Sequence, residues 1–238
     1  MPSFAVILPA AGLSRRFGGI EKKPFATLHG RRVWRRSVEL FRDRPDVLDI
    51  RLIVSPEDAE SFRRRFGADC VSLDVAVVAG GSERFNSVAN ALVALPVEID
   101  YVAVHDAVRP LATAEAIDAV FAAAVRHGAA MLAVPVADTL KRVDGATHRI
   151  TETVARASLW AAQTPQVFRR DWLVDAYANR HRLEQAITDD AQLVEALGHA
   201  VFAVQGSALN FKITTQADFE LAELILKGRE AVSGPVGS

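Results

Sequence analysis

The first candidate for chemistry is a segment of small residues that follows a short apolar run near the start of the chain. It reads Pro-Ala-Ala-Gly-Leu-Ser-Arg-Arg-Phe-Gly-Gly from residue 9, and Lys22, Lys23 and Pro24 come soon after. Small residues let a backbone approach a ligand closely, and loop amides beside Arg and Lys form a cradle for phosphates. An ordinary glycine-rich turn with solvated cations would show the same pattern, so both interpretations stay open.

The spacing of this segment excludes two familiar phosphate-binding motifs. The glycines do not match the P-loop pattern GxxxxGK followed by Ser or Thr. They do not match the dinucleotide-binding pattern GxGxxG either. A Walker-type ATPase and a dinucleotide oxidoreductase are therefore disfavoured. Lysine is also scarce, since only five of the 28 basic residues are Lys, at positions 22, 23, 141, 212 and 227. In a chain that favours Arg, Lys is kept where a compact point charge is needed, although five residues are few enough for chance.

A second turn of small residues lies at Gly80-Gly81 and begins the run Gly-Gly-Ser-Glu-Arg-Phe-Asn-Ser, which ends at Ser87. One interpretation is structural, with Ser82 as the N-cap of a helix. The other is functional, because paired glycines at the end of a strand let a flat base lie against the backbone. In that case Ser87, one turn into the helix, hydrogen-bonds the base. The residues alone do not separate the two.

Asp106 is the carboxylate best placed for metal chemistry, in the run Val-His-Asp-Ala-Val-Arg-Pro from residue 104. Mg²⁺ prefers one or two carboxylates together with phosphate oxygens and water, so Asp106 at a strand end suits a metal held against a nucleotide phosphate. An N-cap or an ion pair with Arg109 is the alternative. The six histidines show no spacing such as HExxH. Two further polar clusters stand at expected strand ends: Gln163-Thr164-Pro165-Gln166 and Asn210-Phe211-Lys212-Ile213-Thr214.

The candidate residues must be positioned by the rest of the chain. Short apolar runs alternate there with amphipathic stretches that are long enough to form helices. The runs are too apolar to be exposed on one side, so we predict a doubly wound, mostly parallel α/β sheet of Rossmann-like type. Ligands of such sheets bind beyond the carboxyl ends of the strands. Strands are predicted at about 4–9, 49–54, 74–79, 100–105, 130–136 and 200–205. Helices are predicted at about 32–43, 56–66, 82–94, 113–127, 171–180, 188–198 and 215–228.

Residues 138–160 interrupt this rhythm, because they alternate polar and apolar types around Asp144-Gly145. That pattern indicates a β-hairpin. A hairpin this polar does not belong in the middle of the sheet, so we expect it to project as an arm. A two-stranded arm is marginally stable alone, and we therefore expect it to pack on a second copy of the chain.

Length and composition place these elements in one folded unit. The 238 residues fit a single domain over 1–228, arm included, with 229–238 as a flexible C-terminal tail. A hydrophobic fraction of 50% and a charged fraction of 24% argue against disorder, collagen and coiled coil. The net charge of −1 provides no strong field for nucleic acid or an anionic membrane.

The location of the protein is also a prediction from the sequence. The longest apolar run, residues 4–13, is too short to span a bilayer and lacks the features of a signal peptide. The single Cys70 excludes an internal disulfide framework, which suits a reducing compartment. We therefore expect a cytoplasmic protein.

Taken together, the motifs resemble those of the 2-C-methyl-D-erythritol 4-phosphate cytidylyltransferase family. They fall in order from about residue 4 to 226, and His-Asp-Ala-x-Arg-Pro, Asp-Thr-x-Lys, Thr-Pro-Gln and the late Lys are the specific ones. The matching pieces are Pro-Ala-Ala-Gly with Arg16 and Lys23, Gly-Gly-Ser-Glu-Arg with Ser87, Val-His-Asp-Ala-Val-Arg-Pro, Pro-Val-Ala-Asp-Thr-Leu-Lys, Arg156-Ala-Ser-Leu-Trp, Gln-Thr-Pro-Gln, Thr188-Asp189-Asp190 and Asn-Phe-Lys-Ile-Thr.

The resemblance implies a nucleotidyltransferase fold and the transfer of CMP from CTP to methylerythritol phosphate, with Mg²⁺ and release of pyrophosphate. It also implies a homodimer in which the arm reaches the neighbouring subunit. The implied catalytic residues are Arg16, Lys23 and Lys212. The implied nucleotide-binding residues are Ala10, Ala11, Gly12, Gly81, Ser87 and Asp106, with Asp106 also beside the metal. The implied acceptor-binding residues are Arg109, Thr139, Arg156 and Thr188, partly from the second subunit.

Three departures from the family pattern bear on these roles. The family usually has Pro-Lys-Gln after the glycine loop, whereas here Lys23 precedes Pro24, so either Lys22 or Lys23 is a candidate for the phosphates. Ser14 replaces a common glycine, and Leu209 stands where a carboxylate often precedes Asn-x-Lys. Two alternatives stay open: a cytidylyltransferase for another polyol phosphate such as ribitol phosphate, and a non-catalytic nucleotide-binding protein on the same fold.

Overall fold

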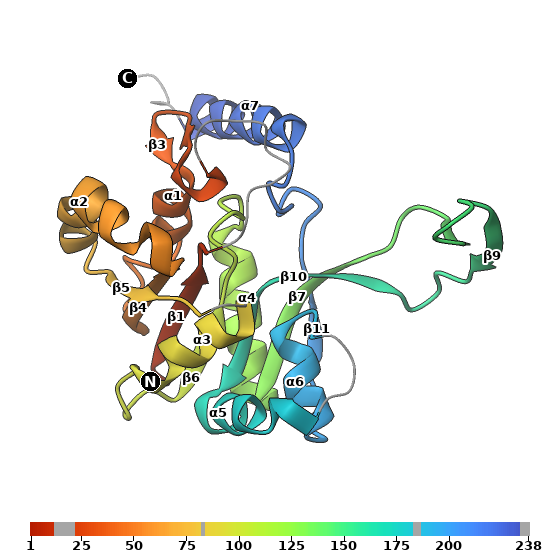
Figure 1. Cartoon of the computed structure of the whole chain (residues 1–238), viewed down its shortest axis with the longest axis horizontal. Coiled ribbons are helices and arrows are strands. Elements are labelled where there is room, and N and C mark those ends of the chain that lie inside the picture. The colour runs from red at the N-terminus through yellow and green to blue at the C-terminus, as the bar shows by residue number, and fades with distance from the viewer. Residues whose placement is uncertain (12–21, 82–83, 183–186, 234–238) are drawn as a thin grey trace.

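A seven-stranded sheet forms the centre of the computed structural model, which describes residues 1–11, 22–81, 84–182 and 187–233 (Figure 1). Neighbouring strands run parallel except at the third strand of the order, which is antiparallel to both of its neighbours. The mostly parallel α/β sheet predicted from the sequence is confirmed. Its order is β11 (Phe202–Gln205), β7 (Ala129–Pro135), β10 (Trp160–Arg169), β6 (Tyr101–Val104), β1 (Phe4–Pro9), β4 (Val47–Val54) and β5 (Ala76–Ala79).

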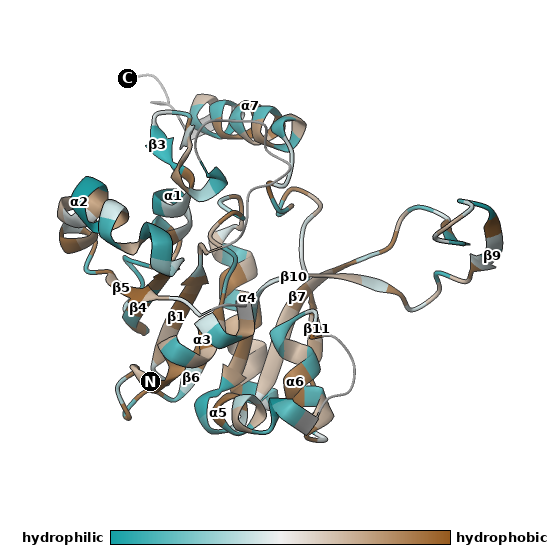
Figure 2. Ribbon diagram, viewed as in Figure 1, coloured by the Kyte–Doolittle hydropathy of each residue, from teal (hydrophilic) through white to brown (hydrophobic). Residues whose placement is uncertain are grey.

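Strand β1 shows why this sheet needs helices on both faces. Phe4, Val6 and Leu8 belong to one apolar cluster, whereas Ala5 and Ile7 belong to another, and none of the five is more than 2% exposed. The central strands are accordingly brown in Figure 2. Helices α1 (Val33–Glu39), α2 (Pro56–Ser72) and α4 (Ala114–His127) supply the first cluster, and α3 (Arg84–Val93), α5 (Arg170–Ala178) and α6 (Asp190–Ala196) supply the second.

Helix α7 (Gln216–Ser233) covers a third, smaller cluster and corrects the prediction of a flexible tail from residue 229. Gly228 does not end the helix. Arg229 donates a hydrogen bond to the carbonyl oxygen of Leu111 at 2.9 Å, and Glu230 pairs with His29 at 2.8 Å. These contacts tie the last turns to the body, while residues 234–238 lie outside the described part. The short elements beneath α7 are η1 (Lys23–Phe25), β2 (Thr27–Leu28) and β3 (Arg31–Arg32), and η2 (Arg180–Arg182) follows α5.

Strand β10 was not among the strands predicted from the sequence. Its polar residues Gln163, Thr164 and Gln166 hide the apolar pattern, yet all three side chains are buried and hydrogen-bonded. The register with β7 shifts between Ala162 and Gln166, at the point where these polar residues begin. Beyond the shift, Val167 and Phe168 are fully buried, as a strand between two neighbours requires.

The region predicted as an arm contains β8 (Leu140–Val143) and β9 (Ile150–Val154), which pair antiparallel as a separate two-stranded sheet. Figure 1 shows this hairpin extending away from the central sheet. Asp144 organises the turn, because its Oδ1 accepts hydrogen bonds from the backbone N–H groups of Ala146 and Thr147. The apolar side chains of Val143 and Ile150 are about half exposed.

Candidate active site

The candidate active site lies at one edge of the central sheet. Strands β1, β4, β5 and β6 are mutually parallel neighbours, so their carboxyl ends meet at this edge. Ala10 and Ala11 follow β1, the Gly80-Gly81 turn follows β5, and Asp106 comes two residues after β6. Three segments that the sequence identified separately are therefore placed on the same side of the sheet.

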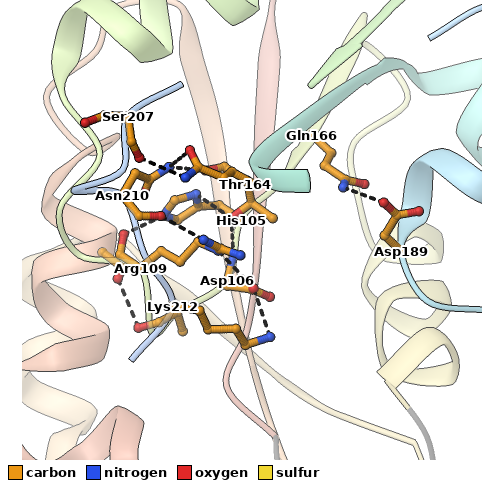
Figure 3. Close-up of polar contacts among 12 residues, drawn as sticks. His105, Asp106, Arg109, Thr164, Gln166, Asp189, Ser207, Asn210 and Lys212 are labelled. Carbon is orange, nitrogen blue, oxygen red and sulfur yellow. Dashed lines mark hydrogen bonds and ion pairs between the residues drawn. The ribbon is translucent and has the colours of Figure 1, made fainter. Parts of the chain in front are cut away.

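Asp106 holds two cations through one carboxylate oxygen (Figure 3). Lys212 Nζ lies 3.0 Å from Asp106 Oδ2, and Arg109 Nε lies 3.4 Å from the same atom. The Asp106 side chain is only 9% exposed, whereas that of Lys212 is 44% exposed. Lys212 comes from the segment between β11 and α7, so the fold joins residues that are more than a hundred positions apart.

Arg109 links the carboxylate to a second segment of chain. Its Nη1 donates to the carbonyl oxygen of Asn210 at 2.7 Å. Burial lowers the pKa of Arg109, and the charge and hydrogen bond of Asp106 act in the opposite direction. A guanidinium keeps its proton in proteins, so Arg109 is a cation here. The site thus has two positive charges around one negative charge.

His105 is fully buried behind Asp106 and is held by two hydrogen bonds. Its Nε2 lies 3.0 Å from the carbonyl oxygen of Arg109, and its Nδ1 lies 3.1 Å from Oγ1 of Thr164. The same Thr164 oxygen accepts the backbone N–H of Asp106 at 3.0 Å. This network assigns the proton to Nε2, which donates to Arg109, while Nδ1 accepts from the Thr164 hydroxyl. Burial lowers the pKa of His105 to about 4, so the ring is neutral at physiological pH.

The glycine turn after β5 brings Ser87 against the backbone. The N–H of Gly81 donates to Ser87 Oγ at 3.0 Å, and Ser87 is 1% exposed. A Cβ added at Gly80 would lie 2.7 Å from the same oxygen, so the close approach requires glycine there. The serine expected as the N-cap, Ser82, lies outside the described residues. A base that reads Ser87 would therefore meet a hydroxyl already oriented by the turn.

The two candidate lysines differ in their surroundings. Lys22 Nζ lies 2.5 Å from Asp58 Oδ2. Burial alone would raise the pKa of Asp58, but hydrogen bonds from Lys22 and Ser55, together with the charge of Lys22, lower it. Lys23 begins η1, directly after Lys22. Lys22 is therefore paired with a carboxylate on α2.

The remaining predicted residues fall into three groups. Ala10 and Ala11 follow β1, and the N–H of Ala10 donates to the carbonyl oxygen of Ile53 at 2.8 Å. Gly12 and Arg16 lie outside the described residues. The third group is Thr139, Arg156 and Thr188: the first two are exposed at the base of the hairpin, and Thr188 precedes α6, where its N–H and hydroxyl contact Gln192.

The sequence singled out residues 163–166 but assigned them no role. In the structure, Thr164 holds the Asp106 turn, while Gln166 holds the start of α6 through Asp189 Oδ2 at 3.1 Å and the N–H of Ala191 at 3.0 Å. The cluster of polar residues in one short segment was a signal for these roles, because such residues must find hydrogen-bond partners if they are buried. The partners themselves depend on the antiparallel placement of β10.

Within residues 1–11, 22–81, 84–182 and 187–233, no group of three or more His, Cys, Asp or Glu side chains is arranged to hold a metal ion. The helices of the same described part include none that is long and apolar enough to cross a membrane.

The doubly wound sheet carries a cation-flanked carboxylate at the carboxyl ends of its parallel strands, an arrangement typical of α/β proteins that bind nucleotides. The family model described as IspD, 2-C-methyl-D-erythritol 4-phosphate cytidylyltransferase, matches residues 4–228. The chain belongs to this family.

Relatives and solved structures agree with that assignment. The chain is 44% identical over 235 residues to the 2-C-methyl-D-erythritol 4-phosphate cytidylyltransferase of Rhodopirellula baltica, covering 94% of this chain and 95% of that protein. It is 44% identical to the bifunctional enzyme IspD/IspF of Rhodospirillum rubrum, with 96% of this chain matching 58% of that longer protein. The structure of 4-diphosphocytidyl-2C-methyl-D-erythritol synthase from Anaerococcus prevotii superposes with a TM-score of 0.80 at 27% identity, covering 95% and 96% of the two chains.

Proposed function

We propose that the protein transfers CMP from CTP to 2-C-methyl-D-erythritol 4-phosphate and releases pyrophosphate, as a step of non-mevalonate isoprenoid biosynthesis. The observation that carries this proposal is the pairing of Lys212 and Arg109 with Asp106 at the carboxyl edge of the sheet. The matched relatives bear this activity in their names. A non-catalytic nucleotide-binding protein would have no need to keep these charges together.

The chemistry follows from the charges of the reactants. A phosphate monoester has its second pKa near 6, so the acceptor phosphate is largely a dianion at neutral pH and needs no general base. One of its oxygens attacks the α-phosphorus of CTP. The bond from that phosphorus to the bridging oxygen breaks, and the electron pair leaves with pyrophosphate. The protein must position the two substrates and neutralise developing negative charge.

The chain's cations suit this task in different ways. In the proposed site Lys212 faces the phosphates from the segment after β11, while Lys23 and Arg16 act from the loop that follows β1. Fixed positive groups of this kind stabilise charge that appears only in the transition state. Because His105 is neutral and buried, it has no part in proton transfer. Its role in the proposed site is to hold the backbone of Asp106 and Arg109.

Nucleotide recognition is assigned to backbone and small side chains. We propose that Gly81 and Ser87 read the cytosine, and that Ala10, Ala11 and Gly12 let the nucleotide lie close to the end of β1. Support for the first assignment is the hydrogen bond from the Gly81 N–H to Ser87 Oγ, which fixes the oxygen and leaves the hydroxyl hydrogen to be donated to a base. The Asp106 carboxylate would face the ribose and the phosphates.

We also propose that Mg²⁺ assists the reaction. Asp106 is a hard oxygen ligand beside the expected phosphates, and Mg²⁺ is commonly bound through one carboxylate with phosphate oxygens and water. The Lys212 and Arg109 cations already contact Oδ2 of this carboxylate, so the donor set fits the ion only when CTP supplies further oxygens. When bound, the ion would neutralise charge on the triphosphate.

The acceptor site is proposed to form between two copies of the chain. Arg109 lies beside Asp106, but Thr139 and Arg156 are exposed on the hairpin that extends from the body (Figure 1). A second copy would bring that hairpin, with Thr139 and Arg156, to the edge where Asp106 lies, while Thr188 stands at the start of α6. We therefore propose a homodimer without nucleic-acid or membrane partners, acting in the cytoplasm where CTP is available.

The experiment that tests this function measures pyrophosphate release with a panel of substrates. We expect rapid release with CTP and methylerythritol phosphate, and little with ribitol phosphate as the acceptor. UTP should react roughly 5- to 150-fold more slowly, because an unpaired polar group in a closed site costs about 1–3 kcal/mol. A faster reaction with ribitol phosphate would instead support the alternative acceptor. No release with any acceptor would contradict catalysis altogether.

A further inference from the structure

Two buried amide side chains connect the segment that carries Lys212 to the central sheet. Asn210 is 2% exposed and Gln163, on β10, is 5% exposed. Asn210 Nδ2 donates to Gln163 Oε1 at 3.3 Å and to the carbonyl oxygen of Thr164 at 2.9 Å. Gln163 Nε2 in turn donates to the carbonyl oxygen of Ser207 at 2.8 Å. The Gln163–Asn210 pair therefore connects β10 to the segment between β11 and α7 at two points.

The backbone of this segment is otherwise attached at its two ends. At the first end, the N–H of Gly206 donates to the carbonyl oxygen of Ala133 at 2.8 Å. At the other, the N–H of Ile213 donates to the carbonyl oxygen of Val108 at 3.0 Å. Between these anchors the amide pair supplies the side-chain contacts to the sheet. Its loss would leave the stretch before Lys212 held from its two ends and by the hydrogen bond from Arg109 to the Asn210 carbonyl.

Glycine at position 206 makes the amide pair possible. A Cβ added there would lie 2.4 Å from Gln163 Oε1, too close for the glutamine to keep its position. The backbone thus approaches the amide more closely than any other residue would allow. The backbone of Gly206 on one side and the hydrogen bond from Asn210 on the other therefore constrain the position of the Gln163 amide.

The same segment also contacts Arg109 and Asp106, beside the expected position of the reacting phosphates. The carbonyl oxygen of Asn210 accepts Arg109 Nη1 at 2.7 Å, and Arg109 Nε contacts Asp106 Oδ2. Two residues after Asn210, the Lys212 ammonium returns to that carboxylate at 3.0 Å. A shift of Asn210 would therefore displace one partner of Arg109 and, two residues along the chain, Lys212 itself (Figure 3).

We propose that Asn210 and Gln163 are positioning residues that hold Lys212 against Asp106 for the transfer step. This inference rests on the proposed function, because Lys212 matters only if charge develops on the phosphates. Misplacement of a charged group by about 1 Å can lower a rate by about a hundredfold. Since the lost interaction belongs to the transition state, turnover falls while the KM for CTP changes little.

The test replaces each amide by an apolar side chain of similar size. Asn210→Leu and Gln163→Met should each lower kcat by roughly tenfold or more, with the KM for CTP within about threefold of wild type. Gln163→Met leaves in place the backbone–backbone contacts of the segment and the hydrogen bond from Asn210 to Thr164, so it serves where Asn210→Leu fails to fold. Far-UV circular dichroism and the melting temperature show whether each variant is folded.

A double-variant comparison separates positioning from general loss of structure. If the pair acts through Lys212, adding Gln163→Met to Lys212→Ala should lower kcat by less than about twofold further. Gln166→Met is the matched control, because Gln166 is an equally buried amide on β10 that holds α6 instead. Its effect on kcat should be the same factor with and without Lys212.

Two results would overturn the inference: equal losses from Gln163→Met in both backgrounds, or unchanged kcat in an active wild-type background. A wild-type protein inactive with CTP and methylerythritol phosphate would instead contradict the proposed function. Where Lys212→Ala is too slow to measure, a crystal structure of Gln163→Met decides. Lys212 displaced from Asp106 supports positioning, and Lys212 still at about 3.0 Å with lowered kcat contradicts it.

Discussion

Residues around Asp106 provide fixed charge and not a titrating pair. Lys212 and Arg109 share one carboxylate oxygen, and the nearest histidine is buried and neutral. A phosphate dianion as nucleophile requires no general base from the residues of this site. Because the charges are present before substrate arrives, little reorganisation is needed when charge develops on the phosphates.

The choice between Lys22 and Lys23 is the first prediction at this scale. Lys22 is held by Asp58 at 2.5 Å, so Lys22→Ala should leave kcat within about threefold of wild type. Lys23→Ala should lower kcat by about a hundredfold or more, as loss of a transition-state cation does. Steady-state pyrophosphate release measures both. An inactive Lys22→Ala beside an active Lys23→Ala would reverse the assignment.

A second prediction concerns the dependence of stability on pH. Burial lowers the pKa of His105 from 6.5 to about 4, so between these values the unfolded chain binds a proton that the folded chain does not. The contribution of neutral His105 is therefore complete above pH 6.5 and falls as the pH drops toward 4. From pH 7.5 to pH 5 this residue should lower the free energy of unfolding by about 2 kcal/mol.

The measurement compares urea unfolding of wild type and His105→Gln at both pH values. Other groups of the protein also titrate in this range, but they are common to the two proteins and cancel in the difference. The wild type should lose about 2 kcal/mol more than the variant on acidification. Equal losses would show that His105 is protonated in the folded state and would contradict the hydrogen-bond network described for it.

At the scale of elements, strand β10 organises the site without belonging to its reactive surface. Three side chains from four consecutive residues hold three different segments: Gln163 holds the segment before Lys212, Thr164 holds Asp106, and Gln166 holds the start of α6. The antiparallel strand can do this because the middle of its length lies beside the carboxyl end of β6, where Gln166 pairs with Val104.

The junction of α4 and β7 supplies a prediction about stability. Gly128 ends α4 with φ at +90°, and a Cβ there would lie 2.3 Å from the ring of Trp172. Gly128→Ala should therefore lower the free energy of unfolding by about 2–4 kcal/mol, from backbone strain and crowding together. Chemical denaturation measures the change.

Gly30→Ala is the control for that variant. Gly30 also has positive φ, +76°, but nothing lies within 4 Å of its added Cβ. It should lose only about 1 kcal/mol, for backbone strain alone. If the two variants lose the same amount, the contact with Trp172 does not constrain the end of α4.

The sequence predicted the six parallel strands and the helices that flank them because their apolar patterns are continuous. It also placed Asp106 and Lys212 at strand ends. It did not predict β10, since buried polar side chains look exposed until their partners are known, and those partners lie 23 to 59 residues away. The end of α7 was misplaced for a related reason: the contacts of Arg229 and Glu230 that extend it are tertiary.

At the scale of the whole molecule, the hairpin is a part of the fold that a single copy of the chain leaves largely exposed to solvent. Its strands are mostly exposed, including Val143 and Ile150, and the hairpin lies apart from the body in Figure 1. A two-stranded ribbon is marginal in water, so packing against a second copy would stabilise it. In the proposed homodimer, Arg156 of one copy completes the acceptor site of the other.

Complementation between two inactive variants tests that arrangement. Lys23→Ala and Arg156→Ala homodimers should both be nearly inactive. In a hybrid of the two, one site carries both lesions and the other carries neither, because the defective residues come from opposite chains. Random pairing makes about half the dimers hybrids, so activity should return to about a quarter of wild type.

The control for complementation is mass spectrometry of the re-paired sample, which must show the hybrid. If Arg156 acts within its own chain, every site keeps one lesion and the mixture is no more active than its parents. That result, with hybrids present, would exclude a site shared between copies.

The fate of the α-phosphorus of CTP tests the central claim most directly. Two reactions with methylerythritol phosphate are compared, one with CTP labelled at the α-phosphorus and one with label at the γ-phosphorus. Attack at the α-phosphorus predicts that the α-label joins the acceptor in a CDP-linked alcohol, whereas the γ-label leaves as pyrophosphate. Transfer of the γ-label to the acceptor, or release of CMP without any linked product, would contradict the account.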